Sequence, residues 1–510
     1  MRKRGLILLG ILLLAACREK DTPVESQHPS IRLEILHVNA FQASFSVNCV
    51  HTASIAYGVG TTVAEASAMG HSAQSESTGA TQFSFTVNDL QPLTDYVLCA
   101  RGIGADGEEG PVQQLSFSTV KGPDGLYPWE SARSAPPGFA DLSLITLGWH
   151  NYNPPAWTAE RFASHVSVGD HWLFDAFLCI DGYDGKRGLS YSIANGRHSA
   201  TQESWEDLLD AWLGDDGALI QLDAAIADAA TRLGQPHKPR YVVMSLPDPV
   251  MFEYFSDKSS STTYWGSLDG QEMDFSLLED QQAAYRWYMD RCRARFQALR
   301  LQHVELAGFY ILSEELPLAP AFYKDAGQSY TEADTWNHPY KRWEELVPWV
   351  SSYAHACNEG LWWIPYHLAP GYRVWKELGF DTVWMQPNYY WDHGNVSHSL
   401  ADTKDALKQY RMGIELEFEY SLVASVMADG RSGPDGSGNP TFYLKDVPLL
   451  RSRVREYMKA FKDTGLYGQL PIAVYSGTDA WHQLATSPDA QDQEMFQEIC
   501  TFITESPLKH

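Results

Sequence analysis

The sequence has few basic residues for its length. Its 510 residues include 38 Lys and Arg against 64 Asp and Glu, which gives a formal net charge of −26. Because nucleic acid is bound through a basic surface, this balance argues against nucleic acid as a partner. The sequence also has no HExxH motif, no paired-histidine spacing and no CxxC motif. We therefore expect neither a metal site nor a cofactor.

Other signatures are missing as well. No GxSxG motif occurs, which argues against a hydrolase of the nucleophile-elbow type. Beyond the N-terminal segment, no stretch reaches the ~18 consecutive apolar residues that a membrane-spanning helix needs. Aromatic residues, in contrast, are plentiful at 13%, with 17 Trp and 26 Tyr, in a chain that is 44% hydrophobic. Flat aromatic side chains in this number suit either a sugar-binding cleft or a large core.

The first residues have the pattern of an export signal. Three basic residues follow Met1, and a short apolar run then ends in LAAC at Cys17. This ending resembles the processing site of bacterial lipoproteins. The resemblance implies a signal peptide over 1–16, a lipid on Cys17, and an extracytoplasmic protein anchored to a bacterial membrane, at the outer membrane or cell surface. An ordinary secretory signal with a chance cysteine is the alternative. The polar residues 17–29 are predicted to be a tether.

Residues 30–120 are predicted to form a small all-β sandwich. Segment 41–47, FQASFSV, alternates apolar and polar residues, and clusters of Gly and Asp mark turns between such runs. The run 90–96, LQPLTDY, resembles the tyrosine corner of fibronectin type III domains and implies that fold. Strand alternation points Cys49 inward and Cys99 outward, so we expect no disulfide between them. The domain is interpreted as a spacer, with a carbohydrate-binding module as the alternative.

The larger part of the chain alternates strand-like and helical patterns. Residues 121–140 are rich in Gly, Pro and Ser and are predicted to be a linker to a domain over 141–510. Apolar runs of the kind found in strands covered on both faces occur eight times, at 142–150, 172–180, 240–246, 304–312, 361–368, 381–389, 413–420 and 471–478. Helical patterns lie between them, at 158–166, 277–301, 340–360, 400–410 and 447–465, and a last one at 491–503 closes the chain.

This alternation predicts an α/β fold, a (β/α)8 TIM-type barrel preceded by the small all-β sandwich. A doubly wound open sheet is the alternative. No GxGxxG motif or phosphate loop follows the first strand-like run of the large domain, which argues against the open sheet.

Acidic residues stand at the carboxyl ends of two predicted barrel strands, where barrels place their active sites. Glu314 and Glu315 follow the fourth run, and the seventh contains Glu415, Glu417 and Glu419 at alternate positions. Alternation puts the last three on one face, which we expect to point into the barrel. Buried carboxylates cost free energy unless they are partnered, so the stripe favours a functional role. An ordinary amphipathic strand facing solvent is the alternative.

The ends of the fourth and seventh strands are expected to face each other across the barrel mouth. Retaining glycosidases use two carboxyls ~5–5.5 Å apart, one to protonate the leaving oxygen and one to attack the anomeric carbon. We expect Glu314 to be the acid/base and Glu417 the nucleophile, with Glu315 and Glu415 as substitutes. The chain departs from common barrel glycosidases, which have Asn before the strand-four Glu, in having Ser313 there.

Polar and aromatic residues recur at the other predicted strand ends. Aromatic faces stack on sugar rings, and Asn, Gln, Asp and His bond to hydroxyl groups. The predicted substrate-binding residues are Trp149, His150, Asn151, Asp181, Tyr183, His367, Gln386, Asn388, Tyr389, Tyr475, Asp479 and Trp481. Asp184, Asp248, Tyr366 and Trp391 occupy neighbouring positions. Each of them taken alone is as well explained by packing.

Three runs of the large domain resemble a known family. GFYILSEE (308–315), FDTVWMQPNYYW (380–391) and GIELEFE (413–419) are similar to the bacterial family described as domain of unknown function 4855. The resemblance covers about 140–500. It implies a glycosidase-type barrel and a carbohydrate context on secreted proteins and lipoproteins, and it assigns no catalytic residues.

Two functions are compatible with these patterns. The first is a surface-anchored glycoside hydrolase acting on an extracellular poly- or oligosaccharide, retaining, with two Glu. The second is a non-catalytic glycan-binding lipoprotein on the same barrel. In both, carbohydrate is the expected partner, the lipid on Cys17 makes the only membrane contact, and other surface proteins of glycan utilisation are further candidate partners.

Overall fold

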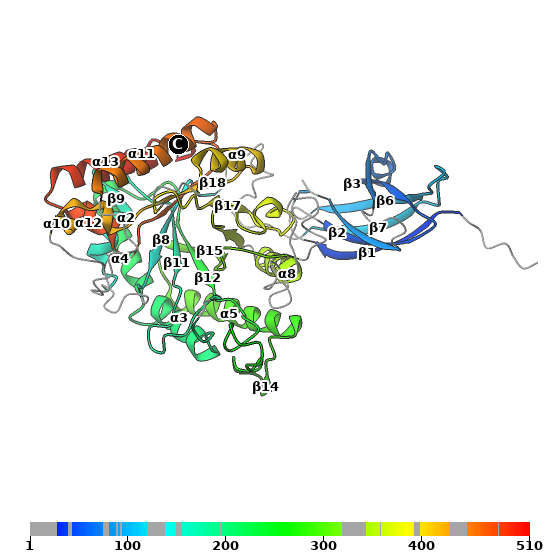
Figure 1. Ribbon diagram of the computed structural model, residues 1–510, viewed down its shortest axis with the longest axis horizontal. Coiled ribbons are helices and arrows are strands. Elements are labelled where there is room, and N and C mark those ends of the chain that lie inside the picture. The colour runs from blue at the N-terminus through cyan, green and yellow to red at the C-terminus, as the bar shows by residue number, and fades with distance from the viewer. Residues whose placement is uncertain are drawn as a thin grey trace, which may run out of the picture. The chain divides into compact units, whose positions relative to one another are not determined.

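The computed structural model divides into two compact units, one in the N-terminal sheets and one that contains the barrel (Figure 1). It describes residues 28–38, 43–74, 81–87, 90–91, 94–119, 138–148, 156–193, 196–318, 343–357, 359–391, 398–428, 446–477 and 479–509. The predicted signal peptide, the lipidation residue Cys17 and most of the predicted linker lie outside this part of the chain.

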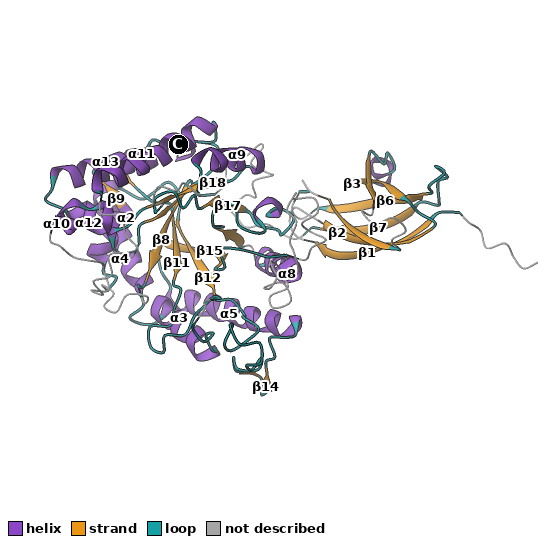
Figure 2. Ribbon diagram, viewed as in Figure 1, coloured by secondary structure: helices purple, strands orange, loops and turns teal. Residues whose placement is uncertain are grey.

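The N-terminal region consists of two β-sheets, and in one of them β3 pairs antiparallel with both β4 and β6 (Figure 2). One sheet has the order β1-β2-β5, with strands Ser30–Val38, Ala43–Val50 and Gln82–Val87. The other has the order β4-β3-β6-β7, with strands His71–Gln74, Ser54–Gly60, Asp95–Ile103 and Gln113–Ser118. Buried apolar side chains from both sheets form a shared core, among them Ile31, Val47, Cys49, Ile55 and Ala100. The predicted all-β sandwich is therefore present, while its fibronectin type III-like character stays a prediction.

Cys49 and Cys99 are both free thiols, as the alternation predicts. The alternation predicts that Cys99 points outward, but its side chain has no exposed surface. The short helix α1, Val63–Ala66, packs against β3, and Ser67 at its end places a hydroxyl 3.9 Å from the Cys99 sulfur. The outward face of this sheet is thus locally covered by a helix that the strand pattern does not indicate.

The large unit is a closed barrel of eight parallel strands, which confirms the predicted fold class. Its strands, in order around the barrel, are β8 Asp141–Thr146, β11 Ala176–Ile180, β12 Arg240–Leu246, β15 Val304–Ile311, β16 Gly360–Trp363, β17 Thr382–Met385, β18 Gly413–Glu417 and β19 Ile472–Tyr475. The ring closes where β19 pairs with β8. Each strand overlaps one of the eight apolar runs, and the long buried runs are what a sheet covered on both faces requires.

Helices surround the barrel strands (Figure 1). They are α2 Ala159–Val166, α3 Gln202–Leu213, α4 Ala218–Leu233, α5 Leu278–Leu299, α8 Trp343–Ala356, α9 Leu400–Tyr410, α10 Ala424–Ala428, α11 Val447–Thr464, α12 Ala480–Thr486 and α13 Ala490–Thr504. Local signals set several of their ends. Asp446 caps the first turn of α11 through the Leu449 N–H, and Gly465 ends it in the left-handed region at φ 76°. Within the described residues, no helix is long and apolar enough to cross a membrane.

Smaller elements fill the connections. Two short hairpins pair β9 Ser167–Val168 with β10 His171–Trp172, and β13 Ser267–Leu268 with β14 Gln271–Glu272. Single 3-10 turns lie at Tyr372–Val374, Tyr420–Leu422 and Pro507–Lys509.

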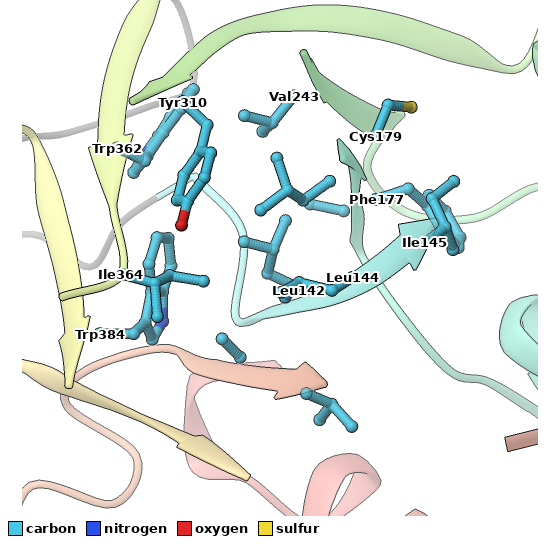
Figure 3. Packing of buried hydrophobic residues seen from close by; sticks show 14 of the residues in the cluster. Leu142, Leu144, Ile145, Phe177, Cys179, Val243, Tyr310, Trp362, Ile364 and Trp384 are labelled. Atoms are coloured by element: carbon cyan, nitrogen blue, oxygen red, sulfur yellow. The ribbon is translucent and has the colours of Figure 1, made fainter. Parts of the chain in front are cut away.

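Aliphatic and aromatic side chains in and next to the barrel strands pack together, among them Leu144, Val243, Ile364, Trp362 and Trp384 (Figure 3). Phe139, just before β8, has its ring centroid 5.4 Å from that of Trp362 on β16 and 6.2 Å from that of Trp384 on β17. The ring centroid of Tyr241 on β12 lies 6.2 Å from that of Phe139. Phe139 precedes β8 and Tyr241 is the second residue of β12, so aromatic side chains pack at the amino end of the barrel, opposite the end where barrels place their active sites.

A buried ion cluster ties the C-terminus to the amino end of the barrel. Lys509 Nζ lies 2.7 Å from Asp141 and 3.0 Å from Asp175, and Arg240 lies 2.7 Å from Asp175. Burial raises the pKa of Asp141 to about 6, and Lys509 opposes that rise. Burial acts in the same direction on Asp175, but Lys509 and Arg240 outweigh it and lower its pKa. The ionised forms of Asp141 and Asp175 are therefore stabilised by Lys509 and, for Asp175, also by Arg240.

We expect Lys509→Ala to lower the free energy of unfolding by about 3–5 kcal/mol, because it leaves buried carboxylates without their cation. Urea unfolding followed by far-UV circular dichroism measures this change. Lys459→Ala is the matched control: it removes an exposed pair with Asp463 and should cost less than about 0.5 kcal/mol. Equal midpoints for the two variants would show that the cluster contributes nothing specific.

Candidate active site

Two cavities lie at the carboxyl ends of the barrel strands. The inner cavity, about 320 Å³, is lined by residues of the strands and the first positions after them: Leu144, Ile180, Tyr310, Glu314, Ile364, Tyr366, Gln386, Asn388, Trp391, Glu415 and Tyr475. The outer cavity, about 680 Å³, is lined largely by loop residues, among them Asp181, Tyr183, Ser192, Ser313, Glu315 and Pro317. Ile180, Glu314, Tyr366 and Tyr475 line both, so the two cavities are neighbouring parts of one cleft.

Glu314 stands at the junction of the two cavities. It follows β15, and its carbonyl accepts a hydrogen bond from the Tyr366 N–H at 2.9 Å, which fixes the backbone here. Its side chain keeps exposed surface because it faces the open cleft. The surrounding protein nevertheless raises the pKa of this carboxyl above its usual 4.5, and the charge of Glu315 adds to the rise. A hydrogen bond from the Gln386 side chain acts in the opposite direction.

Glu415 reaches the inner cavity from the middle of β18. Its apolar neighbours Ile414 and Leu416 have no exposed surface, so the alternation of this strand turns the acids inward, as the sequence predicts. Only 1% of the Glu415 surface is exposed, and Oε2 has no hydrogen-bond partner within the described part of the chain. Burial raises its pKa well above 4.5, and the charges of Glu417 and Glu314 raise it further.

Glu417 ends β18 and is held more firmly than Glu415. Its side chain has no exposed surface, and Oε2 accepts hydrogen bonds from the Asn388 N–H at 2.6 Å and the Tyr457 hydroxyl at 2.8 Å. The Tyr457 oxygen also accepts from the Tyr390 N–H at 2.7 Å, so its own proton is directed to Glu417. Oε1 of Glu417 has no partner among the described residues.

The three carboxyls of Glu314, Glu415 and Glu417 influence one another. Burial raises the pKa of Glu417 to about 8, its two hydrogen-bond donors lower it, and the charge of Glu314 raises it. Like charges in a low-dielectric site cannot all ionise, and the group with the most donors ionises first. Glu417 is therefore the seventh-strand acid best able to carry a charge, while Glu415 retains its proton.

Raised carboxyl pKa values make stability depend on pH. The pKa of Glu417 is raised to about 8 and that of Glu419 to about 7, whereas a Glu side chain in the unfolded chain has a pKa of 4.5. Between these values the folded chain binds more protons than the unfolded chain, so the free energy of unfolding falls as pH rises. The loss begins above about 4.5 and ends near 8, with a slope of up to about 1.4 kcal/mol per pH unit for each proton.

We expect Glu417→Gln to flatten this dependence, because the amide carries no charge at any of these pH values. Thermal unfolding of both proteins at pH 5 and pH 8 measures it. The melting temperature of the variant should exceed that of the unmodified chain more at pH 8 than at pH 5. An identical difference at both pH values would mean that Glu417 titrates normally.

Several predicted substrate-binding residues do line the cleft. Asp181 and Tyr183 line the outer cavity, Gln386 and Asn388 the inner cavity, and Tyr475 both. They are ordered by further contacts. The Thr146 hydroxyl donates to Asp181 at 3.1 Å, and the Arg197 guanidinium lies 4.1 Å from the centre of the Tyr183 ring. The Asn388 side chain donates to Gln386 Oε1 at 3.2 Å, which leaves the Gln386 NH₂ directed at Glu314.

Trp481 and Asp479, two further predicted substrate-binding residues, lie at helix α12 and line neither cavity. Trp481 is 1% exposed, donates its indole N–H to the Ser164 carbonyl at 2.8 Å and packs against Phe174. Asp479 makes a 3.0 Å ion pair with Arg161 of α2. Strand β19 ends at Tyr475, and α12 begins at Ala480 with Asp479 as its N-cap residue.

His367 and Tyr389 also line neither cavity. The His367 ring packs at 5.2 Å against that of His398, and its neighbour Tyr366 faces the cleft instead. Tyr389 donates its hydroxyl to Glu456 of α11 at 2.6 Å. At both strand ends the residue one position earlier is the one that lines the cavity. Glu315 lines the outer cavity, whereas Trp149, His150 and Asn151 lie outside the described residues.

Tyr457 is the site residue that sequence reasoning missed. It lies in the middle of α11, far from any strand end, and its only sequence signal is its place on the buried face of an amphipathic helix. Nothing in that pattern separates a tyrosine that packs from one that holds a carboxylate.

Comparisons with known proteins identify a family and leave the activity open. Residues 141–430, more than half of the chain, match a family model described as Domain of unknown function (DUF4855). No curated protein matches the sequence. The structure is similar to chitinase ChiW from Paenibacillus sp. str. FPU-7, with 11% identity, a TM-score of 0.26, and coverage of 78% of this chain and 31% of that chain.

Two further solved structures are similar at the same low level. For β-glucuronidase 2 from Bacteroides uniformis the identity is 10% and the TM-score 0.29, with 88% of this chain and 45% of that chain covered. For a glycosyl hydrolase family 2 member from Bacteroides cellulosilyticus DSM 14838 the identity is 10% and the TM-score 0.27, with the same coverages of 88% and 45%. The chain thus spans less than half the length of these proteins, and its function has to be inferred from its own site.

Proposed function

The chain belongs to the family described as Domain of unknown function (DUF4855), whose description assigns no activity, and from its site we propose that it is a glycoside hydrolase. One observation carries the proposal. Three mutually interacting carboxyls stand at the carboxyl end of a closed barrel, one facing an open cleft and two buried with unpartnered oxygens. Buried polar atoms without partners are rare in folded proteins, and one of these carboxyls, that of Glu415, lines a cavity that a polyhydroxylated ligand can enter.

Glu314 is proposed as the acid/base. It lies at the junction of the two cavities, where it can reach a glycosidic oxygen, and its raised pKa keeps a proton available. It would protonate the leaving oxygen in the first step. In the second step it would take a proton from the water that releases the sugar.

Glu417 is proposed as the nucleophile. The Tyr457 hydroxyl and the Asn388 N–H both bond to Oε2, which stabilises the carboxylate and leaves Oε1 unpartnered. Asn388 also lines the inner cavity, so Glu417 lies directly behind the cavity wall. Its Oε1 would attack the anomeric carbon to form a covalent glycosyl intermediate, as the leaving group departs with the proton of Glu314.

The rest of the cleft suits an oligosaccharide. Tyr475 and Trp391 line the inner cavity with ring centroids 6.1 Å apart, and Tyr366 and Tyr183 line the outer cavity. Aromatic faces of this kind stack on sugar rings, and Gln386, Asn388 and Asp181 can bond to hydroxyls. With Glu314 between the cavities, the scissile bond would lie at their junction, the inner cavity holding the sugar that is attacked.

A non-catalytic glycan-binding protein is the second candidate. The observation in its favour is that Glu417 has no exposed surface and does not itself line either cavity. If Glu417 cannot reach a bound sugar, the cleft would bind glycans without cleaving them. In both functions, the predicted lipid on Cys17 would hold the protein at an extracytoplasmic membrane surface.

Turnover on a broad panel of oligosaccharides decides between the two. We expect the full chain to release new reducing ends from at least one member of the panel, at a rate that falls in Glu314→Gln. Binding of a glycan, detected by calorimetry, without release of reducing ends would establish the binding function instead.

A further inference from the structure

The inner cavity carries more acid than two-carboxyl hydrolysis needs. If Glu314 and Glu417 perform the chemistry, Glu415 remains, directed into the same cavity and without a catalytic role. It is 1% exposed, and its Oε2 has no hydrogen-bond partner within the described residues. A buried carboxyl with an unsatisfied oxygen costs free energy until a ligand group completes it.

The charge around Glu415 determines which ligand group that is. Glu314 and Glu417 are the charged neighbours that interact with it, and both are acids. The other polar residues of the inner cavity are Tyr310, Tyr366, Tyr475, Gln386 and Asn388, and no Lys, Arg or His is among its described lining residues. An anionic sugar would find only carboxyls and neutral polar groups among these residues, and a neutral hydroxyl would satisfy one oxygen without offsetting a charge on any of the acids. An ammonium group would do both.

Aromatic side chains from the two neighbours of β18 in the barrel, the segment after β17 and the end of β19, also line the cavity. Trp391 and Tyr475 both line it, with their rings tilted at 58° to each other. Aromatic faces attract cations through the ring quadrupole and stack on the apolar face of a sugar. The cavity therefore combines a platform for a sugar ring with an acidic wall for a positive charge.

We propose that the inner cavity is a subsite for a sugar ring that carries a free ammonium group, with Glu415 as the residue that binds the ammonium. This specificity rests on the proposed function, since it assigns the catalytic roles to the other two acids. The substrate class is a glycan that contains unacetylated amino sugars. Uronic-acid and sulfated glycans would find no Lys, Arg or His among the described lining residues of this cavity.

The test uses pairs of monosaccharides that differ only in the group at one carbon. Glucosamine is compared with glucose, and galactosamine with galactose, by titration calorimetry on the full chain at pH 6.5, where a sugar amine is protonated. We expect at least one amino sugar to bind about tenfold or more tightly than its hydroxyl counterpart. Binding should also release protons to the buffer, because the ammonium favours the ionised form of Glu415.

Glu415→Gln supplies the matched variant, since the amide keeps the shape and loses the charge. The preference for the amine and the proton release should both disappear in it, with the fold checked by thermal unfolding. Equal affinity for both members of each pair, or no binding of either amino sugar, would overturn the subsite. Because the pairs are compared on the unmodified chain, this result stands even if the variant does not fold.

The outcomes separate this inference from the proposed function. A preference for the amine without release of reducing ends from any glycan would retain the subsite and overturn the hydrolase. Turnover of neutral oligosaccharides by a chain that shows no preference within the pairs would retain the hydrolase and overturn the subsite.

Discussion

Glu417→Gln is expected to lower kcat by roughly 10⁴-fold or more, because the loss of a nucleophile removes the covalent route altogether. The amide keeps the volume of the carboxyl and can still accept the hydrogen bonds from Tyr457 and Asn388, so the fold and glycan binding should remain. Initial rates on the best substrate of the oligosaccharide panel measure the loss. A binding titration on the same variant shows that the cleft is intact.

Glu419→Gln is the control for this experiment. Glu419 lies one alternation further along the same segment, is buried enough for its pKa to rise to about 7, and lines neither cavity in the described part of the structure. It should retain activity within a few fold. Full activity in Glu417→Gln would end the nucleophile assignment, and loss of activity in Glu415→Gln alone would transfer the role to Glu415.

Glu314→Gln is expected to lower kcat/KM by about 10²–10⁴-fold on natural glycosides, the usual contribution of a general acid. The loss should be much smaller on aryl glycosides whose leaving group needs no protonation. The alkaline limb of the pH–rate profile, which reports deprotonation of the acid, should also disappear. If Glu314 were merely structural, its substitution would lower kcat/KM equally on both classes of substrate and would leave the shape of the pH–rate profile unchanged.

A substitution of the neighbouring Glu315 tests the effect of its charge on Glu314. It lines only the outer cavity, and its charge raises the pKa of Glu314. Glu315→Gln should therefore shift the alkaline limb to lower pH while activity at the optimum stays within about tenfold. An effect as large as that of Glu314→Gln would exchange the two assignments.

The barrel was predictable because its strands are long buried runs. β12, Arg240–Leu246, is buried at every position, as are β8, β16, β17 and β18, and the other three strands are buried at most positions. The acidic stripe of β18 was predictable for the same reason, since apolar Ile414 and Leu416 have to face the helices and force Glu415 and Glu417 inward. Two helices, α3 and α4, were missed, although both have amphipathic stretches before β12.

The details of the site were less accessible, for physical reasons. A position at the end of a strand shows at which end of the barrel a residue lies. It does not show where the side chain points, because side chains no longer alternate regularly between the two faces once the strand has ended. Asn388, at φ 55°, lines the cavity while Tyr389 turns to α11, and Trp481 packs behind β19. The hydrogen bond from Tyr457 joins residues 40 positions apart and has no local signature. The difference between Glu415 and Glu417 depends on this contact.

Trapping the covalent intermediate tests the proposed chemistry most directly. Glu314→Gln is incubated with dinitrophenyl glycosides, which react without an acid but whose intermediate then lacks its base, and the digested protein is analysed by mass spectrometry. We predict a sugar adduct on the peptide that contains Glu417, with fragmentation placing the added mass on that residue. An adduct on Glu415, or steady turnover by the variant with no adduct at all, would contradict a double displacement at Glu417.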